Sequence, residues 1–358
     1  MQDYTFTDAL TGSVIEFNYD LGNVSLTKGD RIPEGHKSIF FPGCSFLNYA
    51  MPLVSAVNDT LMQHGEVDGI SILCCGKILS YEENGRVIRD AFEEQLREHV
   101  HAAGIERIVC ACPNCVKALR EAFAEDERTN HIELAILPQV LADLGYKVDA
   151  NTTARLLTGS EDAHVLLGTH DSCPDREYGD FARGLRAILP DGLWADPEHS
   201  WSKSVCCGSL PRAAGKIKQA DKCADLNGKE GEELGANAIV TACMSCAFQL
   251  NMAQDHLPAI HFLELLYDWR VDWSRVGQWM KLRFLFDESM GAIEKPSSRS
   301  FVGIDDASEV SSPSGSETAF VTSQDEGKRQ SFDIGVDSRM DNNDAIDISN
   351  FDVIEIGE

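Results

Sequence analysis

Cysteines are the residues whose type and spacing could carry chemistry in this chain of 358 residues, which contains twelve of them. Ten fall into two sets with the same order: a single cysteine, an adjacent Cys-Cys-Gly and a Cys-x-x-Cys pair. The gaps between these parts are 29 and 36 residues in the first set and 32 and 35 in the second. Thiolates gathered in this way bind soft metal ions and iron–sulfur clusters. The first set is Cys44, Cys74, Cys75, Cys112 and Cys115, and the second is Cys173, Cys206, Cys207, Cys243 and Cys246.

The repetition extends beyond the cysteines and indicates a duplicated domain. Cys44 aligns with Cys173 at an offset of 129 residues, the two Cys-Cys-Gly sequences align at 132 and the two Cys-x-x-Cys pairs at 131. The segments that close each repeat also match, with Ala135-Ile136 aligned to Ala259-Ile260. Two homologous half-domains of roughly 110 residues follow, divided near residues 150–160.

Apolar runs alternate with helical patterns between the cysteines. This alternation predicts an α/β fold with two half-domains, each containing a small parallel sheet and crossover helices. The clearest helix has an apolar stripe made of Ile88, Phe92, Leu96 and Val100, which we expect to be broadened by Val87 and Ala91. The expected strands are Ser38–Phe41, Ile70–Leu73, Ile105–Val109, Val165–Gly168 and Ala238–Thr241.

The expected sheet edges would gather the cysteines. The carboxyl ends of parallel strands meet at one edge, so loops leaving that edge can bring distant residues to one point. Gly76 and Gly208, which follow the adjacent cysteines, allow backbone conformations and close approaches that a side chain would block. Helical patterns begin near Val116 and Ala247, directly after the Cys-x-x-Cys pairs. We expect the amides at these helix starts to lower the pKa of the thiols.

The number of cysteines in each set bears on which metal they would bind. A zinc ion or a cubane cluster needs four cysteines, and an adjacent pair can hardly donate to one ion without strain, whereas it can serve two neighbouring irons. Two structural zinc sites with spare thiols remain an alternative, and zinc is possible in one half. A disulfide framework is disfavoured, because thiols stay reduced in the cytosol.

Two cysteines and one histidine near the sets need separate interpretations. Cys110 aligns with Thr241 and Cys223 with Phe92, so neither has a cysteine counterpart and both are expected in the core. His170 lies in the loop before the second set, where it could donate to a cluster sulfide or tune a cluster potential. A loop histidine with satisfied hydrogen bonds is the favoured interpretation.

Charge and composition exclude several classes of protein. Acidic residues outnumber basic ones 58 to 31, which gives a net charge of −27 and argues against a nucleic-acid partner. No stretch reaches the ~18 apolar residues of a membrane span, and the first residues lack the basic start and apolar core of a signal peptide. We therefore expect a cytoplasmic protein. Residues 295–358, with 14 acids, 5 bases and 12 serines, predict a disordered tail.

These patterns together predict five segments along the chain. They are an N-terminal extension at 1–36 that contains a small hairpin, the first half-domain at 37–150, the second at 160–270, a C-terminal helix at 271–294 and the acidic tail at 295–358.

Both five-cysteine sets, within about Lys37 to Arg270, resemble the CCG-domain (cysteine-rich domain) family. That family is typified by the cysteine-rich subunit of heterodisulfide reductase and is related to the iron–sulfur subunits of glycolate and lactate oxidation systems. The resemblance implies that each set can hold a noncubane 4Fe-4S cluster, and that the two clusters split a disulfide one electron at a time. It assigns all ten cysteines as cluster ligands, and so as the catalytic, cofactor-binding and metal-binding residues. Oxygen-sensitive clusters of this kind suit an anaerobe.

The leading hypothesis is an iron–sulfur oxidoreductase subunit that reduces a disulfide, or handles electrons in a related thiol reaction. The sequence has no Gly-x-Gly-x-x-Gly motif before a helix and no ferredoxin-like run of cysteines. A flavoprotein or ferredoxin-like partner is therefore expected to supply the electrons. One alternative is an electron-transfer subunit of a 2-hydroxyacid (glycolate or lactate) oxidation complex. Another is a non-catalytic scaffold stabilised by zinc.

Overall fold

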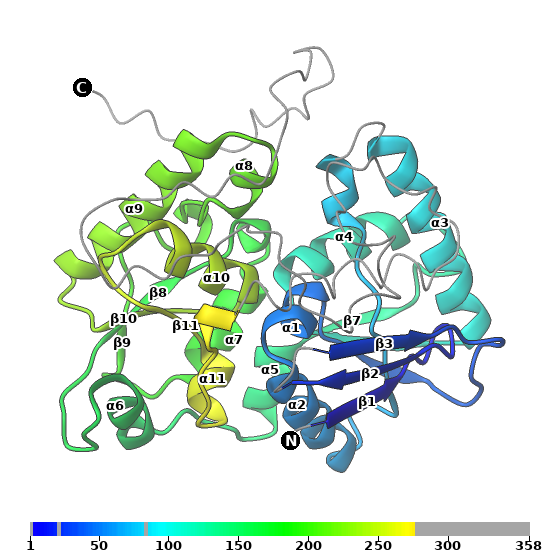
Figure 1. Ribbon diagram of the computed structural model, residues 1–358, viewed down its shortest axis with the longest axis horizontal. Coiled ribbons are helices and arrows are strands. Elements are labelled where there is room, and N and C mark those ends of the chain that lie inside the picture. The colour runs from blue at the N-terminus through cyan, green and yellow to red at the C-terminus, as the bar shows by residue number, and fades with distance from the viewer. Residues whose placement is uncertain (1–2, 20–22, 82–84, 276–358) are drawn as a thin grey trace.

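The computed structural model describes residues 3–19, 23–81 and 85–275, which form two similar halves side by side (Figure 1). Each half is built on a parallel sheet, and a small antiparallel sheet lies against the first half. Of the predicted C-terminal helix at 271–294, the described part contains only a 3-10 turn, η4 (Trp273–Arg275). The predicted acidic tail at 295–358 lies outside the described residues.

The first half contains four parallel strands in the spatial order β5-β4-β6-β7. These strands are β4 (Ser38–Phe41), β5 (Gly69–Ile70), β6 (Arg107–Cys110) and β7 (Glu133–Ile136). Its helices are α1 (Cys44–Tyr49), α2 (Met51–Gln63), η1 (Lys77–Tyr81), α3 (Gly85–Ala103), α4 (Pro113–Phe123) and α5 (Leu137–Asp143).

The second half repeats this arrangement, with the order β9-β8-β10-β11. The predicted α/β fold with two similar halves is therefore confirmed. The strands are β8 (Leu167–His170), β9 (Trp194–Ala195), β10 (Ala238–Thr241) and β11 (Ala259–His261). The helices are α6 (Ala150–Thr158), η2 (Cys173–Asp175), α7 (Asp180–Ile188), η3 (Trp201–Lys203), α8 (Ser209–Ala213), α9 (Ile217–Glu233), α10 (Met244–Ala253) and α11 (Phe262–Leu266).

The predicted strand positions are right, and several bounds differ. Two strands, β4 and β10, have the predicted bounds, and β6 and β8 begin two residues later than predicted. Of the strand predicted at Ile70–Leu73, only Ile70 belongs to β5, which begins at Gly69. Pairing registers also correct the alignment of the closing segments. Ala135 pairs with Val109, whereas the residue that pairs with Val240 is Ile260. Ile136 is therefore equivalent to His261, one residue away from the sequence alignment.

The apolar stripe on α3 is narrower than predicted. Phe92, Leu96 and Val100 are buried and Ile88 is half-buried, because the four-residue spacing keeps them on the face toward the sheet. The expected broadening is wrong: Val87 is 70% exposed and Ala91 is also exposed, since both lie on the solvent side of the helix.

The N-terminal residues form a three-stranded antiparallel sheet, which extends the predicted hairpin by one strand. Its strands are β1 (Asp3–Thr7), β2 (Val14–Asn18) and β3 (Asn23–Thr27). Asp8 connects this sheet to the first half, because its buried carboxylate accepts hydrogen bonds from Ser71 Oγ at 3.0 Å and the Ile72 amide at 2.6 Å. The same carboxylate accepts from the amides of Leu10 and Thr11, both at 2.8 Å. The sheet thus braces the segment that leads into Cys74 and Cys75.

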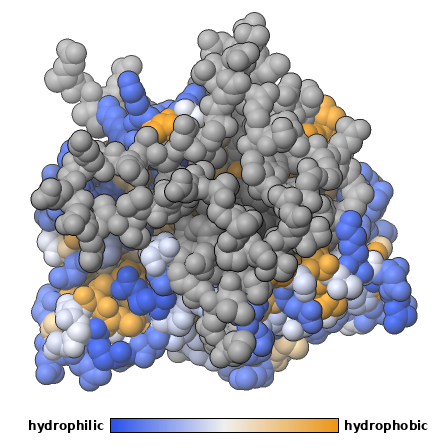
Figure 2. Space-filling model, in the orientation of Figure 1, coloured by the Kyte–Doolittle hydropathy of each residue, from blue (hydrophilic) through white to orange (hydrophobic). Residues whose placement is uncertain are grey.

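The two halves share a continuous hydrophobic core. Helix α5 of the first half packs on α7 of the second, where Gly184 allows the close approach: a Cβ atom there would lie 2.7 Å from the Gln139 amide nitrogen. The stretch at which we expected the halves to divide forms α6. Hydrophilic and apolar residues are interspersed on the surface in Figure 2, and no helix of the described residues has the length and apolar character for a membrane span.

Candidate metal centre

The strand order places the cysteine loops at corresponding points of both halves. In each sheet the first and third strands of the half lie side by side, and their crossovers leave in opposite directions, which creates a crevice at their carboxyl ends. Cys44 and Cys112 follow this pair of strands in the first half, and Cys173 and Cys243 follow it in the second. The adjacent cysteines lie in the loops before η1 and α8. The predicted gathering of cysteines at the sheet edges is confirmed.

The ten thiols form one continuous series of sulfur contacts that runs through both halves. Electrostatic interactions link each thiol to the next, and the hydrogen bond from Cys173 Sγ to Cys206 Sγ measures 3.7 Å. All twelve cysteines are free thiols. The order of the series is Cys44, Cys74, Cys75, Cys115, Cys112, Cys243, Cys246, Cys207, Cys206 and Cys173.

The two five-cysteine sets meet at the contact between Cys112 and Cys243. Both residues are N-caps, of α4 and α10, so the two helix starts approach each other across the boundary between the halves. A hydrogen bond of 2.6 Å between Ser45 Oγ and Ser245 Oγ lies at the same boundary. The sets therefore adjoin and can act as one extended site.

The helices that carry the Cys-x-x-Cys pairs begin three residues earlier than predicted, at Pro113 and Met244. Proline suits this position because it needs no amide hydrogen in the first turn. The earlier start makes the first cysteine of each pair the N-cap and places the second within the first turn. Both thiols of each pair therefore lie at the end of the helix where amide groups point outward.

Glycines permit the tight loops around the thiols, as predicted. Gly76 and Gly208 have φ values of +74° and +99°, in the left-handed region that disfavours side chains. The Gly208 amide donates to Cys206 Sγ at 3.3 Å. Gly43 precedes the first cysteine, and a Cβ atom there would lie 3.0 Å from Cys115 Sγ.

Nine of the ten thiols have shifted pKa values, three lowered and six raised. Cys75, Cys206 and Cys243 each accept hydrogen bonds from flanking thiols, which lowers their pKa values. For Cys206 the bonds from Cys173 and Cys207 and the Gly208 amide lower the pKa to about 3. The donor thiols have raised pKa values, because their bonds and their burial favour the protonated form.

The lowered pKa predicted for the thiols of the Cys-x-x-Cys pairs is found only at Cys243; the pKa values of Cys112, Cys115 and Cys246 are raised. The Cys246 amide contributes to the lowered pKa of Cys243. For Cys112 the bond with Cys115 lowers the pKa, but the bond donated to Cys243 and complete burial raise it more. The interaction of Cys112 with Cys243, the other N-cap, thus helps to raise the pKa of Cys112 although this thiol lies at a helix start.

The two remaining cysteines lie outside the series, in the core as predicted. Cys110 is fully buried on β6, and burial raises its pKa well above the ordinary value. Burial also raises the pKa of Cys223, on α9, to about 11. Neither thiol is easily ionised, which makes both poor metal ligands.

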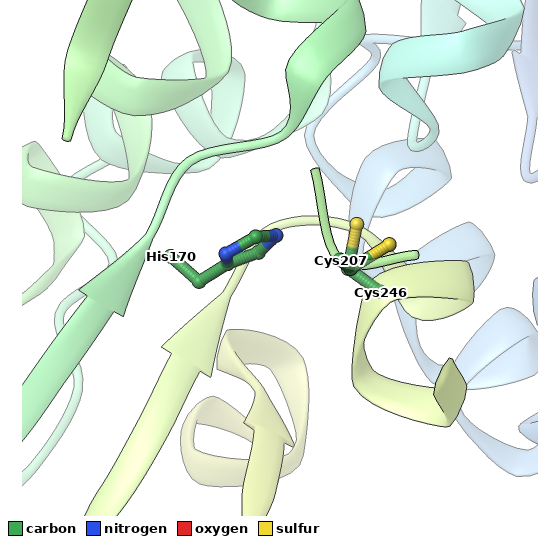
Figure 3. A group of neighbouring side chains, drawn as sticks. All are labelled: His170, Cys207 and Cys246. Carbon is green, nitrogen blue, oxygen red and sulfur yellow. The ribbon is translucent and has the colours of Figure 1, made fainter. Parts of the chain in front are cut away.

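His170 differs from the favoured interpretation of a satisfied loop histidine. It ends β8 and is 3% exposed, with Nδ1 2.7 Å from Oδ1 of Asn227. Its other ring nitrogen, Nε2, is buried without a hydrogen-bond partner among the described residues. One ring nitrogen of His170 and the sulfurs of Cys207 and Cys246 lie within 4.8 Å of one another. Figure 3 shows these three side chains.

Asn227 is the residue that the sequence analysis missed. It lies on α9 at the position equivalent to Leu96 on α3, because Gly104 and Gly235, which follow the two helices with positive φ values, align at the same offset as the Cys-x-x-Cys pairs. A polar residue aligned with a buried leucine was a signal available in the repeat itself. Phe41 aligns with His170 at the 129-residue offset of the single cysteines, and the two residues pair with the equivalent residues Cys110 and Thr241.

A duplicated parallel α/β fold with a continuous series of thiols defines a class of proteins that bind metal ions or iron–sulfur clusters. Comparison with known families matches the CCG cysteine-rich domain twice, over residues 38–120 and 167–251. The chain therefore contains two copies of the CCG cysteine-rich domain, a domain that occurs among iron–sulfur redox proteins. Both matched regions lie within the two predicted half-domains. Comparison with curated proteins finds no match.

Solved structures give weaker similarities. Glutamate racemase RacE1 from Bacillus anthracis is 10% identical, with a TM-score of 0.29 and coverage of 64% of this chain and 77% of the racemase. An aspartate racemase homologue from Pyrococcus horikoshii is 12% identical, with a TM-score of 0.26 and coverage of 65% and 96%. Similarities at this level carry no argument about fold or function.

Proposed function

We propose that this chain is an iron–sulfur oxidoreductase subunit that passes electrons from a flavoprotein or ferredoxin-like partner to a disulfide substrate. The observation that carries the proposal is the uninterrupted series of ten thiols through both halves, with the sets in contact at Cys112 and Cys243. Two isolated structural zinc sites would not require the sets to touch. The two copies of the cysteine-rich domain support the same class of function.

The donor set fits iron–sulfur clusters. Each half offers five thiols, and three of the ten already have lowered pKa values in the absence of a cation. Eight of the ten are buried, which excludes water from the sulfur atoms. When bound, such clusters supply one-electron transfer. The ten cysteines would be the ligands, five in each half.

Cys44 and Cys173 are half-buried and lie at the two ends of the series, whereas the other eight thiols are buried. Basic side chains lie near these parts of the site. Lys77 lowers the pKa of Cys75, and Arg176 acts in the same direction on Cys173. Arg176 is held by its Nε, which donates to the Ser204 carbonyl oxygen at 2.7 Å. These cations offset thiolate charge and would favour an anionic thiol or disulfide substrate.

The stoichiometry of the reaction agrees with two adjoining sites. A disulfide takes up two electrons and two protons, its S–S bond breaks, and two thiols are released. The electron-donor partner is oxidised by the same two electrons.

Metal analysis of protein purified anaerobically as the full chain tests the proposal. We expect several irons and matching acid-labile sulfide per chain, little zinc, and reduction of a disulfide by a reduced viologen dye. The control is the same protein treated with an iron chelator, which should lose the dye-dependent activity. Stoichiometric zinc without iron after reconstitution would contradict the iron–sulfur proposal, whereas iron without disulfide reduction would contradict only the substrate.

A further inference from the structure

The orientation of the Asn227 amide is fixed by two backbone carbonyls. Its Nδ2 donates to the carbonyl oxygen of Cys223 at 2.8 Å and to that of Cys206 at 3.2 Å. Carbonyl oxygens only accept hydrogen bonds, so a flipped amide would bring Oδ1 against two other oxygens. Oδ1 is therefore the atom that lies 2.7 Å from Nδ1 of His170.

This amide in turn fixes the tautomer of His170. An amide oxygen only accepts, so the proton of the imidazole must be on Nδ1. Nε2 then carries a lone pair, and this atom is buried with no hydrogen-bond partner in the described parts of the chain. Figure 3 shows the ring extending from the end of β8 toward Cys207 and Cys246.

An unpaired buried acceptor of this kind destabilises the folded chain, because it has lost its hydrogen bonds to water without replacement. A metal ion held by the facing thiolates removes that cost, because neutral imidazole nitrogen and thiolate sulfur together suit iron and zinc. A hydrogen bond from the other ring nitrogen to an amide or carboxylate oxygen is also the usual support of a ligating histidine.

We propose that His170 is a metal ligand in the second half, through Nε2 and together with Cys207 and Cys246, and that Asn227 is the positioning residue that sets its tautomer. This assignment depends on the proposed function in one respect, namely that the metal is iron. The first half has no equivalent, because Phe41 and Leu96 occupy the corresponding positions.

The assignment makes the two halves electronically different. A neutral nitrogen ligand adds no negative charge to the site, and histidine ligation raises the reduction potential of iron–sulfur centres relative to thiolate ligation alone. The second half should therefore have the higher potential, so that electrons pass from the first half to the second. The contact between Cys112 and Cys243 lies on that route.

Pulsed electron paramagnetic resonance on the full chain tests the proposal, with protein prepared unlabelled and with ¹⁵N-histidine. In iron-loaded protein we expect a nitrogen coupling of a size typical of a directly bound imidazole, which changes on ¹⁵N labelling. The variant His170→Phe, which installs the residue of the first half, should abolish that coupling and lower the potential of one centre. Asn227→Leu should weaken or lose the coupling while His170 is still present, which a merely structural role would not produce.

The matched control is His164→Gln, because His164 is exposed and lies six residues before His170. The nitrogen coupling and the reduction potentials of the His164→Gln variant should equal those of the wild type. If the purified chain holds zinc instead, X-ray absorption at zinc should show imidazole scattering that His170→Phe removes, which supports the histidine ligand and contradicts the iron–sulfur proposal. If the iron-loaded wild-type protein shows no nitrogen coupling from histidine, the ligand assignment is overturned and the proposed function is unaffected. A chain that retains no metal overturns both.

Discussion

The first and second halves have the same thiols but different side chains behind them. At the end of the first strand of each half, Phe41 stands where the second half has His170. On the following long helix, buried Leu96 stands where the second half has Asn227. An apolar pair in one half is thus replaced by a hydrogen-bonded polar pair in the other.

A third pair of positions follows the same trend. Ile136 ends β7, and its equivalent His261 ends β11 beside Cys243. The His261 Nδ1 accepts from the Leu263 amide at 3.3 Å, so Nε2 carries the proton. Burial lowers the pKa of His261 to about 4, which keeps the ring neutral at pH 7. The second half therefore offers polar groups to its thiols at a second point.

The comparison separates two tasks within the repeat. The cysteines and glycines define the ligand loops, and they are alike in both halves. Polar groups around thiolate ligands tune their charge and potential, and these groups are found on the second half at each of the compared positions. A duplicated scaffold can in this way hold two centres of similar type and different potential.

Serine substitution of the equivalent cysteines should have the largest effect. Cys75→Ser and Cys207→Ser each remove one thiol that lies in the middle of its set, so each should lose about half of the bound iron, and the double variant nearly all. Iron content and the spectroscopic signal of each centre provide the measurement. The controls Cys110→Ser and Cys223→Ser should keep the wild-type iron content, and equal losses in these controls would mean that the ligands have been misassigned.

Alanine at the two loop glycines should reveal how rigidly each half holds its adjacent cysteines. A Cβ atom on Gly208 would lie 2.4 Å from the carbonyl oxygen of Ala220, whereas one on Gly76 would meet the ring of Phe92 at 2.5 Å. A backbone carbonyl can move away from a new Cβ atom less easily than an aromatic side chain can. We therefore expect Gly208→Ala to lower the free energy of unfolding by about 3 kcal/mol and Gly76→Ala by somewhat less. Gly145→Ala, with a positive φ and open space, isolates the conformational cost alone. Equal denaturation midpoints for all three variants would refute the packing argument.

The N-terminal sheet distinguishes the halves further, because it braces only the first. Asp8→Asn replaces one of the two acceptor oxygens with an NH2 group, which faces the amide hydrogen of either Leu10 or Ile72 and costs about 2 kcal/mol of unfolding free energy. The variant should also loosen metal binding in the first half more than in the second. Chemical denaturation and the loss of each centre to a chelator measure the two effects. Asp30→Asn, at an exposed position, serves as the control, and equal chelation of both centres would contradict the bracing role.

Much of the fold and the set of clustered thiols could be predicted from the sequence. The duplicated spacing of cysteines requires equivalent loops, and apolar runs before these loops require buried strands. The spacing could not show that Cys112 and Cys243 meet, because contact between the halves depends on helix packing such as that of α5 on α7. The roles of the ten cysteines as cluster ligands remain predictions.

Finer features depended on tertiary context. Val87 and Ala91 fit a broad apolar stripe, yet α3 needs only one narrow face against its sheet. The start of α4 was misplaced because Pro113 was not recognised as a first-turn residue. The environment of His170 depended on Asn227, which is 57 residues away in the sequence.

The last prediction concerns how the final helix of each half begins. The first half starts α5 with Leu137-Pro138, whereas the second starts α11 with a capping box in which Glu264 accepts from the His261 amide at 2.8 Å. Burial raises the pKa of Glu264 from 4.5 to about 7, so the folded state binds this proton more tightly than the unfolded state. Stability should therefore fall as pH rises from about 4.5 to 7, by at most about 1.4 kcal/mol per pH unit. Denaturation midpoints of the wild type and Glu264→Gln between pH 4.5 and 8 measure this slope, which the variant should lack, and parallel pH profiles for the two proteins would show that Glu264 is ionised throughout.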